Sequence, residues 1–176
     1  MKKIFWLILL LFLAGNMIYF VSDQEWRGRV DHAPNETIEV SLFFVDEAIL
    51  LRSDCSATQE IKISISPSGD VVEATIKELL SGVPKSHRGK GLIDKFYNNG
   101  FLPSEIGSLS QYYKRITITR KTAVIDFRAE AMVYLNAAAC LQAAVKSPII
   151  KTLQQFPGID SVEFSIEGQI ITEWDA

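Results

Sequence analysis

Histidine and cysteine are both scarce in this 176-residue chain, which contains two of each. His32 lies beside Pro34 in a polar stretch and His87 lies in a basic one, and neither adjoins a serine or cysteine in a nucleophile motif. Two cysteines with two distant histidines also lack the spacing of a metal-ligand set. The sequence therefore predicts no metal, no cofactor and no catalytic residue, and we expect the chain not to be an enzyme.

The chain also has no excess of basic over acidic residues. The formal net charge is −3, and it becomes −5 once Lys2 and Lys3 are left out. A mildly acidic chain disfavours wholesale nucleic-acid binding. No internal repeat or low-complexity tract is present, and Gly89 and Gly91 follow no predicted strand, so no phosphate loop is indicated. About 155 residues follow residue 21, enough for one domain with its own core.

A long apolar run opens the chain. No charge interrupts the stretch from Ile4 to Val21, and a helix over it would be about 27 Å long, close to the hydrocarbon thickness of a bilayer. Lysines before the run and acids just after it place the N-terminus in the cytoplasm and the remainder outside. We expect residues 1–21 to form a transmembrane anchor, residues 22–37 a juxtamembrane spacer and residues 38–176 an extracytoplasmic domain.

Removal of the run as a signal peptide, with secretion of the domain, is the alternative. The run exceeds the usual apolar region of about 7–15 residues. The small pair Ala14-Gly15 follows Phe12 and Leu13, which fit a cleavage site poorly. Asn16 stands where a lipoprotein signal would have its lipidated cysteine. These features favour the anchor.

The two cysteines, Cys55 and Cys140, both lie beyond the apolar run. An even count in an oxidising compartment predicts a disulfide. The crosslink would close a loop of more than 80 residues. The entropy that the unfolded chain thereby loses would stabilise the fold by about 4–5 kcal/mol. Two buried free thiols are the alternative.

Hydrophobic periodicity predicts two helices. Ser66 is the expected cap of the first, with Pro67 in its first turn and an apolar stripe that ends before Gly82. The second follows an apolar face from Leu141 to Phe156, and Pro148 is expected to kink or restart it.

Alternating and β-branched stretches predict strands at 38–45, 61–65, 115–119, 122–127, 162–166 and 169–174, and residues 85–111 remain an unassigned loop. The order β-β-α-β-β-α-β-β indicates an α+β fold, with two helices packed on one face of a largely antiparallel sheet.

Four short stretches follow one another as in the GerMN domain of bacterial sporulation and spore-germination proteins: Glu78–Gly82, Val124–Phe127, Thr152–Pro157 and Val162–Gly168. The resemblance extends from about Ile38 to Trp174, and the cysteine pair resembles an arrangement in some members. Val83 and Lys62 depart from the usual pattern. The resemblance implies an envelope-associated, non-catalytic binding or assembly module, similar to the ring-building modules of secretion systems. It transfers no active-site residue.

Two features remain as candidate sites. Lys85, Arg88 and Lys90 form the sharpest charge cluster in an acidic domain, and they are candidates for contact with anionic headgroups, wall polymers or an acidic subunit. A solvated loop is the alternative. Asp126 is an acid within an apolar strand, expected to accept hydrogen bonds from a neighbouring turn or to lie on an exposed face, with a role in a site as the alternative.

These observations favour a non-catalytic, membrane-anchored interaction module of the bacterial cell envelope. Its expected partners are the membrane and a second copy or another envelope protein. One alternative is a small-ligand sensor with a pocket under the 85–111 loop. Another is a peptidoglycan-active enzyme, which would need Asp126 to face a second carboxylate across a deep cleft.

Overall fold

The computed structural model describes residues 37–50, 54–96 and 106–172. The expected anchor at 1–21 and all of the expected spacer except Thr37 lie outside these ranges. Inside them, no single helix has both the length and the apolar composition to cross a membrane. Only the pair Ala129–Leu135 and Ala139–Gln154, bent by 107° at its break, meets both criteria jointly.

A first sheet is built around one long strand. Its order is β2-β1-β3 and both pairings are antiparallel, with β1 matched to β2 along its length from Ile38↔Ile65 to Val45↔Thr58. Alternate residues of β1 are buried, as expected for a strand with one face on the core. The elements are β1 (Ile38–Asp46), the short α2 (Glu47–Leu50), β2 (Thr58–Ile65) and β3 (Leu92–Ile93).

A second sheet has the order β4-β5-β6-β7, with β5 and β6 parallel and its other pairings antiparallel. Arg120 and Lys121 both have positive φ, 47° and 67°, as two-residue turns that match the strand twist require. Glu167 and Gly168 form the corresponding turn of the last hairpin. The strands are β4 (Tyr113–Thr119), β5 (Thr122–Phe127), β6 (Ser161–Ile166) and β7 (Gln169–Ile170).

The first long helix, α3 (Val71–Leu80), begins later than the sequence predicts. The Asp70 carboxylate caps it by accepting the N–H groups of Val72 and Glu73, so the expected cap at Ser66 is wrong. A carboxylate at this position accepts two backbone N–H groups that have no acceptor within the helix. Pro67 lies in the connection before the helix, not in its first turn. Gly82, at φ 95°, ends the helix as predicted.

The second long helix, α6 (Ala139–Gln154), continues through Pro148 without a restart. Besides α2, the described connections contain the short helices η1 (Lys85–His87), α4 (Leu109–Tyr112), η2 (Ala129–Ala131) and α5 (Met132–Leu135). The 85–111 loop therefore contains η1, β3 and part of α4, and its residues 97–105 lie outside the described ranges.

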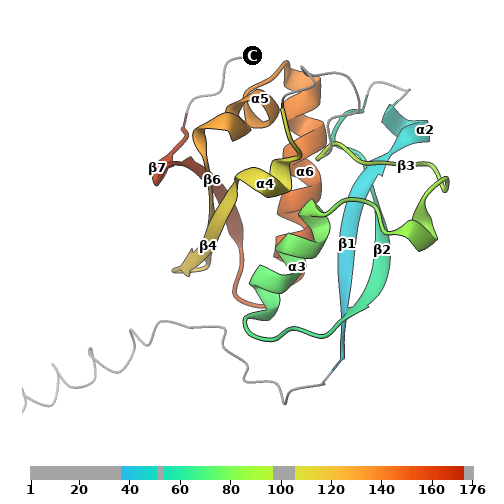
Figure 1. Ribbon diagram of the computed structural model, residues 1–176, viewed down its shortest axis with the longest axis horizontal. Helices are drawn as coiled ribbons and strands as arrows, with labels where there is room; N and C mark the ends of the chain where they lie inside the picture. The colour runs from blue at the N-terminus through green and yellow to red at the C-terminus, as the bar shows by residue number, and fades with distance from the viewer. Residues whose placement is uncertain (1–36, 51–53, 97–105, 173–176) are drawn as a thin grey trace, which may run out of the picture.

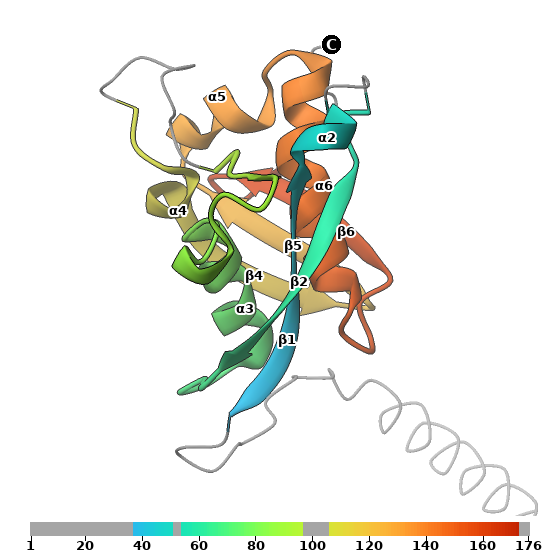
Figure 2. The same ribbon diagram turned by 90° about the vertical axis from the view of Figure 1, so that its right-hand side faces the viewer.

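Both long helices lie between the two sheets (Figure 1). The view turned by 90° shows β1 and β2 in front of α3 and α6, with β4 and β5 behind them (Figure 2). The predicted α+β class and largely antiparallel pairing are therefore correct, but the single sheet with helices on one face is wrong. The reason lies in α6, which contacts β1 on one side and β6 on the other. The core fills the space between these layers, and its buried members include Leu42, Phe44, Ile76, Ile125 and Ile149.

Candidate functional site

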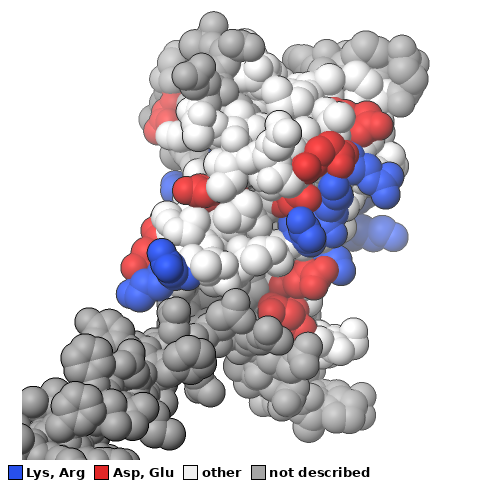
Figure 3. Space-filling view, turned by 90° about the vertical axis from the view of Figure 1, so that its left-hand side faces the viewer, with Lys and Arg blue, Asp and Glu red and all other residues white. Residues whose placement is uncertain are grey.

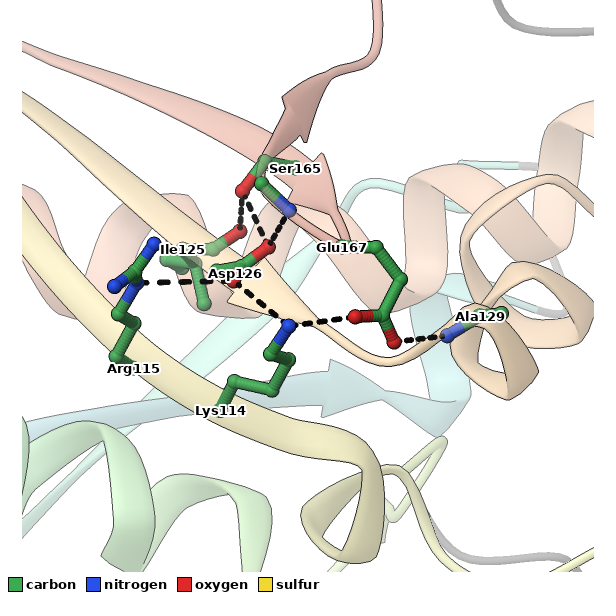
Figure 4. Close-up of polar contacts among 8 residues, drawn as sticks. Lys114, Arg115, Ile125, Asp126, Ala129, Ser165 and Glu167 are labelled. Atoms are coloured by element: carbon green, nitrogen blue, oxygen red, sulfur yellow. Dashed lines mark hydrogen bonds and ion pairs between the residues drawn. The ribbon is translucent and has the colours of Figure 1, made fainter.

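A buried carboxylate on β5 organises the second sheet (Figure 4). Asp126 is 3% exposed, and its Oδ1 accepts hydrogen bonds from the backbone N–H of Gly168 at 2.7 Å and from the hydroxyl of Ser165 at 2.9 Å. Lys114 Nζ and Arg115 Nε lie 3.5 and 3.7 Å from Oδ2. Asp126 thus joins β4, β5, β6 and the β6–β7 turn at one point. Its predicted role as an acceptor for a neighbouring turn is confirmed.

The same network continues outward through Lys114. Its Nζ lies 2.6 Å from Glu167 Oε2, and Glu167 Oε1 accepts the backbone N–H of Ala129 at 3.3 Å. Lys114 therefore bridges two carboxylates, of which Asp126 is buried and Glu167 is exposed. The two acids are held on either side of a lysine, and they do not face each other across a cleft as a pair of hydrolytic carboxylates would.

Two opposing effects act on the Asp126 carboxyl. Burial raises its pKa, but the hydrogen bonds from Gly168 and Ser165, together with the charge of Lys114, outweigh burial and lower the pKa below its ordinary value. The pKa of Lys114 is raised, chiefly by its hydrogen bond to Glu167. Asp126 is therefore ionised near neutrality, and its charge is used in holding strands together.

The outer face of the second sheet carries both positive and negative side chains. Figure 3 shows basic and acidic side chains next to one another on this side of the molecule, around an uncharged area. At one end of β4, Lys114 and Arg115 lie against Asp126, and at the other end Lys121 Nζ lies 3.1 Å from Asp160 Oδ2. Such mixed charge favours directed contacts over a general attraction to one polyelectrolyte.

The predicted basic cluster gathers on one turn. Lys85 begins η1, Arg88 follows its end, and Lys90 comes two residues later, all three exposed. Arg88 Nε donates to the carbonyl of Val83 at 3.3 Å, and the carbonyl of Gly91 accepts the N–H of Glu47. The turn is thereby tied to the residues that follow α3 and to the first residue of α2. The role of its three cations in binding an anion or a partner stays a prediction.

Polar side chains of α6 complete the hydrogen bonding of β1, a role that sequence reasoning missed. Gln155 Oε1 accepts the N–H of Ser41 at 2.8 Å, while its Nε2 donates to the carbonyl of the same residue at 2.7 Å. Thr152 Oγ1 accepts the N–H of Phe43 at 3.1 Å. Thr152 lies in the last turn of α6 and Gln155 directly follows the helix, and both belong to the stretch Thr152–Pro157. The signal available in the sequence was the presence of polar residues, Thr152 and Gln155, next to the apolar residues Leu153 and Phe156.

The structure joins Cys55 and Cys140 in a disulfide, as predicted, across 85 residues of sequence. Their Cα atoms are 5.2 Å apart. Beside the crosslink, Ser147 donates its hydroxyl proton to the carbonyl of Ser56 at 2.8 Å. The turn before β2 is therefore fixed to α6 both covalently and by a hydrogen bond.

A shallow, open hollow of about 410 Å³ lies at β7 and α5, with apolar walls that include Met132, Ile166 and Ile170. It is not under the 85–111 loop, where the sensor interpretation places its pocket. Throughout the described ranges, no three His, Cys, Asp or Glu side chains come close enough to hold a metal ion.

Comparisons with known proteins agree with this architecture. Residues 18–172 match the profile of the Germane family, described as sporulation and spore germination. The tandem GerMN domains of the sporulation protein GerM from Bacillus subtilis superpose with a TM-score of 0.50 at 17% identity, over 78% of this chain and 42% of that one. This chain thus spans less than half of the tandem structure. The first GerMN domain of the same protein gives a TM-score of 0.49 at 16% identity, over 79% of this chain and 90% of that one.

A comparison with curated proteins gives no match. The likeness to the solved structures, at these identities, concerns the fold. The family match covers most of the sequence, from the end of the apolar run to the residues just after β7. The chain belongs to the Germane family of sporulation and spore germination domains.

Proposed function

We propose that this chain is a non-catalytic interaction module, held at the outer face of a bacterial membrane by residues 1–21, which contributes to assembly of the cell envelope. The membership of the family supports an envelope role connected with sporulation or germination. The basic residues before the apolar run and the acids after it support the orientation. The Cys55–Cys140 disulfide supports an oxidising compartment.

The observation that carries the proposal is the state of Asp126. Among the acids of this chain, it is the one whose sequence context most invites a chemical role, and it is 3% exposed with hydrogen bonds from Ser165 and Gly168. The engagement of this one acid in holding the fold supports a non-catalytic function.

Location is tested by attaching a reporter that is active only outside the cytoplasm, at the C-terminus and separately at Lys2. We expect activity from the C-terminal fusion and none from the other, together with a mature protein that retains its N-terminal residues by mass spectrometry. An inactive C-terminal fusion, activity from the Lys2 fusion, or a mature chain starting beyond Val21 would contradict the anchored arrangement.

Function as a contact module is tested by photo-crosslinking in intact cells. A photoreactive residue is placed at exposed positions on each layer, with Lys62 on β2, Arg88 beside η1 and Thr117 on β4 as the first three. We expect at least one position to give a discrete crosslink to an envelope protein while the others do not. Absence of any crosslink, or turnover of a wall polymer by the purified protein, would refute the proposal.

A further inference from the structure

The sheets of the described residues have four edges, and three of them are closed to further pairing. Beyond β3, the edge of β1 is occupied by the Thr152 and Gln155 side chains. The edge strand β7 is two residues long. The edge strand β2 carries Glu60 and Lys62 in its middle, and charged side chains there oppose pairing with another strand.

The fourth edge, β4, has none of these protections along most of its length. It is seven residues long and pairs with β5 alone. The run Ile116-Thr117-Ile118-Thr119 is uncharged and entirely β-branched, the composition that favours strand pairing most. Because a two-residue turn makes Thr119 and Thr122 a hydrogen-bonded pair, the backbone N–H and C=O of Ile118 point away from β5. They are directed toward the open edge.

Basic residues stand at both ends of this run. Lys114 and Lys121 are engaged with acids, at 2.6 Å from Glu167 and 3.1 Å from Asp160. Arg115 is less committed: its side chain is 69% exposed and its Nε lies 3.7 Å from Asp126. Arg120 is exposed and has no ion pair within the described part of the chain. The strand therefore has one exposed arginine near its start and another in the turn that follows it.

We propose that the open edge of β4 binds an extended segment of another envelope protein, with an uncharged, β-branched centre and a carboxylate at each end. This inference rests on the proposed function, and it assigns the contact with an envelope protein to the edge of β4. The segment adds a strand beside β4, with main-chain hydrogen bonds to Ile118 and the carbonyl of Ile116. Its terminal carboxylates meet Arg115 and Arg120, whose planar guanidinium groups suit bidentate pairing.

The test uses the full chain in detergent, labelled for NMR, and two hexapeptides with blocked ends: Asp-Val-Thr-Val-Thr-Asp and Lys-Val-Thr-Val-Thr-Lys. In the free protein, the amide of Ile118 should exchange with solvent faster than those of Thr117 and Thr119. The acidic peptide should slow exchange at Ile118 at least tenfold and should bind at least tenfold more tightly than the basic one.

Two variants at one exposed position provide the matched control. Thr117→Lys places a charge in the centre of the edge and should abolish peptide binding, while Thr117→Val keeps the strand uncharged and should preserve it. Equal binding of both peptides, binding of neither at millimolar concentration, or protection at β2 or β7 would overturn the proposal. So would protection of Ile118 that rises with protein concentration alone, which would make a second copy the occupant.

Failure of this inference is distinguishable from failure of the proposed function. For this comparison the photoreactive residue stands at Thr119 instead of Thr117. If Thr117→Lys retains the envelope crosslinks that are formed without this substitution, another surface makes the contact and the β4 proposal falls, while the contact function stands. If the unmodified chain gives no crosslink at any position, the contact function falls whatever the peptides do.

Discussion

Gln155, at the C-terminal end of α6, and Ser41 of β1 are joined by two hydrogen bonds, one in each direction, between a side-chain amide and the backbone groups of one residue. The amide of Gln155 has the donor and acceptor of a peptide unit, so it continues the sheet beyond the point where β3 ends. A side chain at the end of a helix thereby supplies the hydrogen-bond donor and acceptor that the backbone of a neighbouring strand would supply. The arrangement explains how one helix can hold two sheets together.

The first prediction concerns this contact. Gln155→Ala leaves the N–H and C=O of Ser41 without a protein partner, and Thr152→Val does the same to the N–H of Phe43. Each substitution should lower the free energy of unfolding by about 1–3 kcal/mol, since part-buried backbone groups lose hydrogen bonds. Urea denaturation gives the value. Gln154→Ala, in an exposed neighbour, is the control, and an equal loss there would contradict the interpretation.

The second prediction concerns the buried acid. Asp126→Asn removes the charge that faces Lys114 and should destabilise the protein by about 1–3 kcal/mol at neutral pH. The folded pKa of Asp126 lies below its ordinary value of 3.8. Its contribution is therefore present in full above about pH 5 and is lost as the pH falls through the folded pKa.

Denaturation of both proteins between pH 2 and 8 tests this dependence. The gap in unfolding free energy between the native chain and Asp126→Asn should be constant above pH 5 and should narrow below pH 4. Glu167→Gln, at the exposed end of the same network, should cost less than Asp126→Asn, because the Glu167 side chain is 53% exposed. A gap that stays constant down to pH 2 would show that the charge of Asp126 contributes nothing.

The third prediction concerns the crosslink. Replacement of Cys55 and Cys140 by serine should lower the free energy of unfolding by about 2–4 kcal/mol, because the open chain regains the freedom of the 85-residue loop. Reductant should produce a similar loss in the native protein and none in the double variant. Equal stability with and without reductant in the native protein would contradict a structural role.

The fourth prediction concerns a lysine on α6. Burial lowers the pKa of Lys146 to about 8, and its Nζ donates to Gln142 Oε1 at 3.2 Å. Between pH 8 and 10 the unfolded chain binds more protons at this residue than the folded one, so stability rises with pH across that interval. Lys146→Met should remove the rise, whereas the exposed control Lys151→Met should keep it. Parallel pH profiles for the native chain and Lys146→Met would refute the prediction.

Local signals in the sequence were sufficient to locate the strands other than β3, although β2 begins earlier and β7 ends sooner than predicted. The alternation in 61–65 and the β-branched run of β4 predict strands that the structure contains. The predicted strands also leave two-residue gaps at 120–121 and 167–168, where the structure has turns. The cap of α3 was misplaced because Ser66 and Asp70 both offer an acceptor, and only tertiary packing selects between them.

The division into two sheets and the amide contact of Gln155 were beyond local reasoning. Both depend on residues more than 100 positions apart, Ser41 and Gln155 among them, and one sequence gives no measure of such proximity. Asp126 was recognisable as unusual from its apolar context, but its partner in the turn, Gly168, acts through a backbone N–H that any residue would have. The basic turn at 85–90 was located correctly, since charge clustering is itself local.

The bridge between Cys55 and Cys140 also determines what a protease can achieve. A cut anywhere between these two positions produces two fragments that stay covalently attached, one with β1 and the other with α6. A nicked molecule would migrate as an intact one on a non-reducing gel and would separate only after reduction. In an environment rich in extracellular peptidases, damage to the intervening connections therefore need not release either half from the other.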